Sequence, residues 1–155
     1  MNRPLLTMTI AASLTALSAL TGCRGTAATT PEYRYELASI PYPKSAKAAP
    51  DVDIVAARQG ENLRLVNRTP WEYTDIEVWI NQQYVYRIDK IDIGSDNLIP
   101  LSEAINEFEI PFPLGTFLRP EKGFPVVLTE LYDPKTQLKY RLNTPPVRDE
   151  PGIFW

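Results

Sequence analysis

The 155-residue sequence contains no histidine and only one cysteine, Cys23. The absence of histidine excludes Ser-His-Asp and Cys-His catalysis, together with zinc sites that depend on imidazole. A single thiol cannot form a disulfide within the chain. The sequence therefore lacks the residues of the commonest catalytic sets, and we expect a protein that is not an enzyme and that holds no metal or other non-covalent cofactor.

The sequence also lacks an apolar run long enough to span a membrane. Its most apolar stretch, from Leu5 to Leu20, is diluted with Thr and Ser and is shorter than the roughly 20 residues that a spanning helix requires. Arg3 is the one charge in residues 1–22, and small residues follow the apolar stretch. This order is typical of a secretory signal, so we predict that residues 1–22 are a signal peptide that is removed.

The four residues Leu20-Thr21-Gly22-Cys23 resemble the lipobox of bacterial lipoproteins. The resemblance implies that the Cys23 thiol receives a diacylglyceryl group, that the chain is cut before Cys23, and that the new amine is acylated. The alternative is an ordinary signal peptide with an incidental cysteine. The residue after the cysteine is Arg24 and not Asp. In this respect the sequence resembles proteobacterial lipoproteins that are sorted to the outer membrane. We therefore expect a lipid-anchored protein of the cell envelope, at the outer membrane.

No block of charge of one sign is present, and the net charge is only −3. Nucleic acids and anionic membranes usually require a basic patch, so we expect no nucleic-acid partner. Membrane attachment is instead expected through the lipid on Cys23.

Fifteen prolines divide the chain into short elements and argue against a helical protein. Residues 24–50 are rich in Ala, Thr, Ser and Pro, which predicts a tether over 23–50. The alternation of Tyr33, Tyr35 and Leu37 favours an edge strand at 33–37 within it, with a disordered aromatic patch as the alternative. We predict a folded domain over 51–147 and a C-terminal tail over 148–155.

The domain shows the two-residue period of β-strands. Apolar residues alternate from Val52 to Ala56, from Leu63 to Leu65, from Ile76 to Ile80, from Tyr84 to Ile88 and from Leu138 to Leu142, with turn signals between the runs. This pattern predicts an all-β fold, an antiparallel sandwich of about seven strands. Residues 63–81 resemble bacterial immunoglobulin-like or fibronectin type III-like modules, although the cysteine pair of antibody domains is missing.

Three polar groupings are weaker candidates for chemistry. Glu103, Glu107 and Glu109 would converge for acid-base catalysis if the first two shared a helical face, although a solvated acidic turn is the usual case. Ser45 and Lys47 form a serine-lysine pair only in the presumed tether, where a rigid site is hard to build. The segment 89–97 gathers oxygen ligands around a glycine and would suit Ca²⁺, but Asx-rich turns explain it without a metal.

Aromatic residues are the better candidates for binding. If alternate residues of 76–80 point inward, Trp79 points outward beside Trp71 and Tyr73, and the three rings form a platform for a sugar or a protein. The alternative is that the tether covers Trp79, or that its ring lies flat beside Arg87 in a cross-strand pair. Phe154 and Trp155 end the sequence, and they either dock into a partner or cover a sheet edge.

These observations predict a lipid-anchored, non-catalytic lipoprotein whose β-sandwich contacts a protein partner in the envelope. The alternative is a module that binds glycan or peptidoglycan through its aromatic residues.

Overall fold

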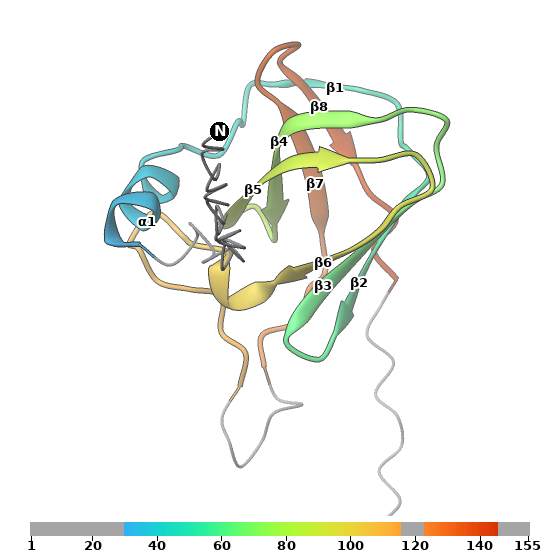
Figure 1. Ribbon diagram of the computed structural model, residues 1–155. Coiled ribbons are helices and arrows are strands. Elements are labelled where there is room, and N and C mark those ends of the chain that lie inside the picture. Colours follow the sequence, from blue (N-terminus) through green and yellow to red (C-terminus); the bar gives the residue numbers. More distant parts are fainter. Residues whose placement is uncertain (1–29, 116–122, 146–155) are drawn as a thin grey trace, which may run out of the picture.

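The computed structural model describes residues 30–115 and 123–145. Within these ranges the chain is mostly β-strand and forms two packed sheets, so the predicted all-β sandwich is confirmed at this level (Figure 1). The larger sheet has the order β1-β8-β7-β4-β5 and the smaller sheet the order β2-β3-β6. The strands are β1 (Lys47–Ala48), β2 (Ile54–Gln59), β3 (Asn62–Asn67), β4 (Tyr73–Ile80), β5 (Tyr84–Ile91), β6 (Asp96–Pro100), β7 (Thr129–Asp133) and β8 (Leu138–Arg141).

The pairing is antiparallel except at one edge of the larger sheet. There β1 runs parallel to β8, with Lys47 opposite Leu138, which departs from the fully antiparallel arrangement that we expected. Beyond β8 the chain crosses to the smaller sheet. The Asn143 amide donates to the Ile54 carbonyl at 3.0 Å, and the Asn143 carbonyl accepts from the Ala56 amide at 2.9 Å. These bonds close one side of the sandwich.

The core between the sheets consists of the alternating apolar residues that the sequence predicts. Burial of such side chains from both sheets is the main stabilising contribution to a sandwich. The larger sheet contributes Ile76, Val78, Ile80 and Leu131, and the smaller sheet contributes Ile54, Ala56, Leu63, Leu65 and Ile99.

Residues 33–37, which we expected to form an edge strand, lie instead in helix α1 (Pro31–Ala38). The Thr30 hydroxyl accepts a hydrogen bond from the Tyr33 amide at 3.3 Å, and Pro31 takes the first helical position. A capping side chain followed by proline favours a helix start, which the alternation of aromatic residues concealed. In the described ranges no helix has the length and apolar character that crossing a bilayer requires.

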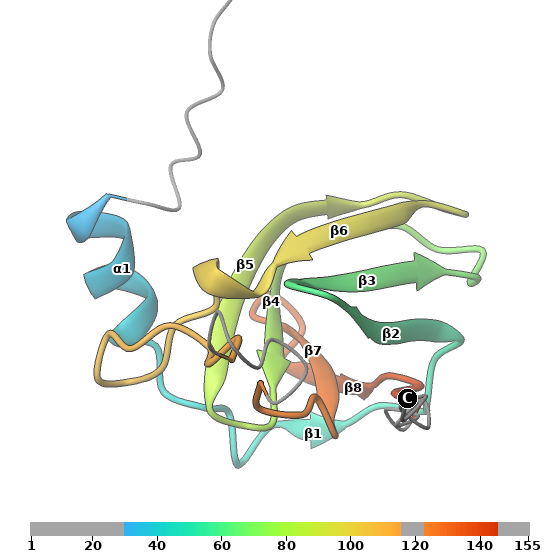
Figure 2. The same ribbon diagram turned by 90° about the horizontal axis from the view of Figure 1, so that it is seen from below.

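Residues 39–46, which we call the strap, lead from α1 past the larger sheet to β1 (Figure 2). Ile40 and Tyr42 of the strap pack on a second, smaller apolar cluster that includes Leu37 and Trp79. The expectation of a tether over 23–50 is therefore wrong for its later part, because from residue 31 onward the chain is folded against the sandwich.

Candidate binding site

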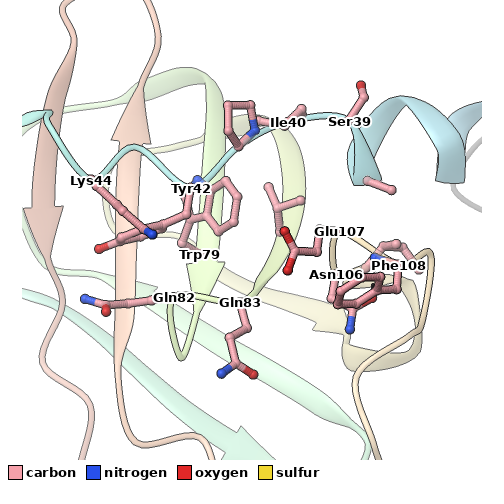
Figure 3. A pocket seen from close by; sticks show the side chains of 14 residues that line it. Ser39, Ile40, Tyr42, Lys44, Trp79, Gln82, Gln83, Asn106, Glu107 and Phe108 are labelled. Carbon is pink, nitrogen blue, oxygen red and sulfur yellow. Dashed lines mark hydrogen bonds between the residues drawn. The ribbon is translucent and has the colours of Figure 1, made fainter.

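Trp79 does not form part of an exposed platform. It lies on the outer face of β4, as the alternation predicts, but only 2% of it is exposed. The ring of Tyr42 meets it edge to face, with 5.2 Å between ring centroids (Figure 3). The alternative prediction, in which the N-terminal segment covers Trp79, is the one that the structure confirms.

A closed group of hydrogen bonds lies beneath the strap. The Tyr42 hydroxyl donates to Glu130 Oε2 at 2.6 Å and accepts from Lys139 Nζ at 2.8 Å. Lys139 Nζ lies 3.7 Å from Glu130 Oε1, and Gln82 Nε2 donates to Glu130 Oε2 at 3.4 Å. The hydrogen bond with Tyr42 raises the pKa of Lys139, and burial raises the pKa of Tyr42. Lys139 is thus held protonated, and neither side chain is poised as a nucleophile or base.

Glu77 lies next to this group on the same face of β4 and is nearly covered. Its Oε2 accepts a hydrogen bond from the Trp79 indole at 3.1 Å. Burial raises the pKa of the Glu77 carboxyl, and Arg87, its partner on β5, partly offsets that shift. The carboxylate therefore lowers the stability of the fold at neutral pH.

Replacing Glu77 with glutamine is expected to raise the free energy of unfolding by about 0.5 kcal/mol near neutral pH, because a nearly covered charge is removed while an oxygen remains for Trp79. The folded-state pKa lies above the unfolded value of 4.5, so the wild-type protein loses stability as pH rises from 4.5 through the raised pKa. The gain should therefore disappear below pH 4.5. Urea unfolding on both sides of this window measures it, with the exposed Glu61→Gln as control. An equal gain at both pH values would contradict the explanation.

A groove of about 650 Å³ opens beside the strap (Figure 3). Tyr42 and Trp79 meet at one part of it, and the turn between β4 and β5 and the loop after the 3₁₀ turn η2 (Leu101–Glu103) supply other walls. The lining combines aromatic rings with amide and carboxyl groups, among them Gln82, Gln83, Asn106, Glu107 and Phe108.

A second groove, of about 460 Å³, adjoins the loop between β3 and β4. Trp71 lines it with 67% of its surface exposed, whereas Tyr73 is half-buried and meets Tyr140 edge to face at 5.8 Å. Asp133 and Lys135 supply polar groups. We call these five residues the Trp71 surface. The structure thus brings together two of the three aromatic residues predicted to bind, Trp71 and Tyr73, and separates them from Trp79.

Asn67, which the sequence reasoning did not single out, holds the Trp71 loop in place. Its side chain is 1% exposed, and its Nδ2 donates to the carbonyls of Trp71 at 2.8 Å and Asp92 at 2.9 Å. Its Oδ1 accepts from the amide and the hydroxyl of Thr69 at 3.0 and 2.8 Å. Asn67 therefore joins this loop to the turn after β5. The signal was available in Asn-Arg-Thr, because Asx side chains commonly bond the backbone two residues ahead.

The carboxylate and serine-lysine candidates are not assembled into a site. Glu103 ends η2, whereas Glu107 and Glu109 lie in the loop beyond it, so the expected helical face does not exist. Ser45 lies in the strap and Lys47 in β1, and the described residues show no hydrogen bond between them. Neither grouping supports a catalytic assignment.

Two of the three acids in the segment proposed for Ca²⁺, Asp92 and Asp96, are paired with basic side chains. Asp92 lies 2.7 Å from Lys90, and Asp96 pairs with Arg64 across β3 and β6. In the part of the chain that the structure describes, no three His, Cys, Asp or Glu side chains gather as a set of metal ligands. The segment forms a turn in which the Ser95 amide donates to the Asp92 carbonyl at 3.2 Å.

No protein-family model, curated protein or solved structure matches this chain. Cys23 and its lipobox, together with Phe154 and Trp155, lie outside the described residues. The candidate binding site consequently rests on the geometry of the Trp71 surface and of the groove beside the strap.

Proposed function

We propose that this protein is a lipid-anchored, non-catalytic lipoprotein of the cell envelope that binds a protein partner through the Trp71 surface. The lipobox Leu20-Thr21-Gly22-Cys23 supports the anchor, and Arg24 favours the outer membrane. The two packed sheets and the strand-turn-strand unit of β3 and β4 support an immunoglobulin-like or fibronectin type III-like variety of sandwich.

The exposure of Trp71 beside a groove is the observation that carries the partner assignment. Tryptophan is the residue most often found at the energetic centre of protein interfaces, because a large ring supplies apolar area with little rotamer entropy. Here Asn67 fixes the loop beneath the ring, so less order has to be imposed on binding. Polar groups of Asp133 and Lys135 border the aromatic residues, as in the rim of an interface.

A non-catalytic role is favoured by the residues that are present as well as by those that are missing. The sequence has no histidine, and the buried charged group around Glu130 and Lys139 is closed by its own hydrogen bonds. A general base needs an accessible, suitably tuned side chain, and this group does not provide one.

Binding of glycan or peptidoglycan is a second candidate, and the groove beside the strap favours it. Amide side chains of Gln82, Gln83 and Asn106 line this groove near the ring of Phe108. Sugars are bound by such combinations, in which a ring packs on the apolar face of the sugar and amides bond its hydroxyls. Titration with soluble cell-wall fragments, followed by chemical shifts of the amide side chains, would distinguish this groove from the Trp71 surface.

Photocrosslinking in cells tests the partner assignment directly. A photoreactive residue at position 71 is expected to give one discrete protein adduct, whereas the same probe at Val127, which is equally exposed, should give none. Adducts of equal strength at both positions, or none at position 71, would contradict the proposal.

The variant Trp71→Ala is expected to weaken the captured complex about tenfold, because an anchoring ring at an interface typically contributes more than about 1 kcal/mol. Its stability should change little, since most of the ring is exposed in the free protein. The affinity of the purified complex measures this effect, and Val127→Ala is the matched control.

A further inference from the structure

Helix α1 and the loop after η2 lie at the opposite end of the described fold from the turn between β5 and β6 (Figures 1 and 2), and both carry exposed apolar residues. Tyr35 on α1 is 68% exposed, and Phe108 and Ile110 in the loop after η2 are 71% and 52% exposed. The loop is attached to the helix, since Arg34 Nη2 donates to the Glu109 carbonyl at 2.8 Å. We call Tyr35, Phe108 and Ile110 the α1 patch.

The position of α1 in the chain limits its distance from the lipid anchor. Thr30, the residue before α1, follows Cys23 by seven residues. Even fully extended, a segment of that length spans at most about 25 Å. Because α1 already belongs to the folded domain, the domain is held much closer to the anchor than a tether reaching to residue 50 would allow. The α1 patch therefore includes the described element that follows Cys23 most closely along the chain.

We propose that the α1 patch rests on the surface of the bilayer that holds Cys23, with its three side chains in the interfacial layer of a zwitterionic membrane. This inference rests on the lipid anchor proposed above. A short tether keeps the patch at an effective concentration on the order of millimolar at the surface, so weak interfacial contacts suffice. Tyrosine and phenylalanine suit that layer, where apolar rings meet polar headgroups.

The charges around the patch select the type of lipid. The carboxylates of Glu32, Glu107 and Glu109 form no ion pair within the described residues, whereas Glu36 is paired with Arg87 at 2.6 Å. Unpaired carboxylates are repelled by an anionic surface. Contact is therefore expected with phosphatidylethanolamine or phosphatidylcholine, and it should weaken when phosphatidylglycerol is added. The Trp71 loop is joined through Asn67 to the turn after β5, at the end opposite α1, so in this arrangement a partner can reach the Trp71 surface.

Spin labelling of the acylated full chain in phosphatidylethanolamine–phosphatidylcholine vesicles tests the proposal. Because Cys23 is the only cysteine and its thiol carries the lipid, a nitroxide attaches solely to a new cysteine at Tyr35→Cys or, as control, at Ile93→Cys in the turn after β5. The readout is the ratio of collisions with oxygen, which concentrates in lipid, to collisions with a water-soluble nickel chelate. We expect this ratio to be several-fold higher at position 35. With the label at 35, Phe108→Ser should lower it and Ile93→Ser should not.

The outcomes separate the anchor from the patch. Mass spectrometry and flotation of the same preparation report acylation and attachment. A chain that is not acylated and does not float overturns the proposed function and this inference together. An acylated, floating chain with equal ratios at positions 35 and 93 overturns the α1 patch alone. Spin–spin broadening at position 35 would assign the patch to a second copy, and a ratio that rises with phosphatidylglycerol would overturn the zwitterionic assignment.

Discussion

Replacing Asn67 with alanine is expected to lower the free energy of unfolding by about 3 kcal/mol, because two donors and two acceptors lose a shared buried partner. The carbonyls of Trp71 and Asp92 and the amide of Thr69 now bond the Asn67 side chain. Alanine leaves these groups facing a small cavity. Urea denaturation followed by circular dichroism measures the loss, and the melting temperature should fall by about 10 °C.

Two further substitutions identify the cause of that loss. Asn67→Asp keeps an acceptor for Thr69 but places a carboxylate against two carbonyl oxygens, so it should also lower the free energy of unfolding. The loss should be smaller at acid pH, where the carboxyl is protonated. The control Asn97→Ala removes only a half-buried bond to Ser95 at 2.7 Å and should cost no more than about 0.5 kcal/mol. Equal losses for Asn67→Ala and Asn97→Ala would show that the Trp71 loop does not depend on Asn67.

The second large effect is expected for Lys139→Met, which should lower the free energy of unfolding by about 2 kcal/mol. Glu130 is nearly covered, and in the variant its charge would keep only the bonds from Tyr42 and Gln82. Leaving one buried charge without its counterion costs more than the pair itself contributes. Chemical denaturation near neutral pH measures the difference.

A double variant and a pH series test this reasoning. Lys139→Met combined with Glu130→Gln removes both charges and keeps an acceptor for Tyr42, so most of the stability should return. The raised pKa of Lys139 means that its contribution is present below the unfolded value of 10.5 and is lost as pH rises through the folded value. The gap between wild type and Lys139→Met should therefore narrow in alkali. A constant gap, or a double variant no better than the single one, would contradict the role of the pair.

The strands were predictable because their chemistry is local. Alternate apolar residues in β2, β3, β4 and β5 face the core as the sequence indicates. The turn of the last hairpin is also local, since the Lys135 amide donates to Asp133 Oδ1 at 2.8 Å, a bond that an Asp-Pro pair favours. Where one face is buried and the other solvated, a period of two residues specifies both the element and its orientation.

The position of the strap over Trp79 was not predictable in the same way. Proline-rich residues 39–46 have no period, and their place depends on partners far along the chain, such as Glu130 and Lys139. Burial of Trp79 is decided by Tyr42, a residue that composition alone assigns to a linker. Local patterns cannot report a contact whose energy depends on the meeting of two distant segments.

The candidate binding site was predicted in part. An exposed Trp71 beside Tyr73 follows from their place at a strand entry, and the structure keeps the two together. Tyr140 also lines this groove, but it lies far from Trp71 and Tyr73 in the sequence and was not predicted. The α1 patch was not predicted either, because Tyr35 was expected in an edge strand and lies in helix α1.

The position of the strap has a consequence for the order in which the molecule can form. Tyr42 bonds residues that follow it by 88 and 97 positions, and β1 is completed by β8. A chain that leaves a ribosome or a translocation channel from its N-terminus can build the β2–β3 and β4–β5 hairpins early, because each closes over a short loop. The strap, by contrast, lacks Glu130, Lys139 and the neighbouring strand β8 until the last strands emerge, although its apolar contacts with Trp79 on β4 can form earlier. We therefore expect the strap to complete its hydrogen bonds late in folding.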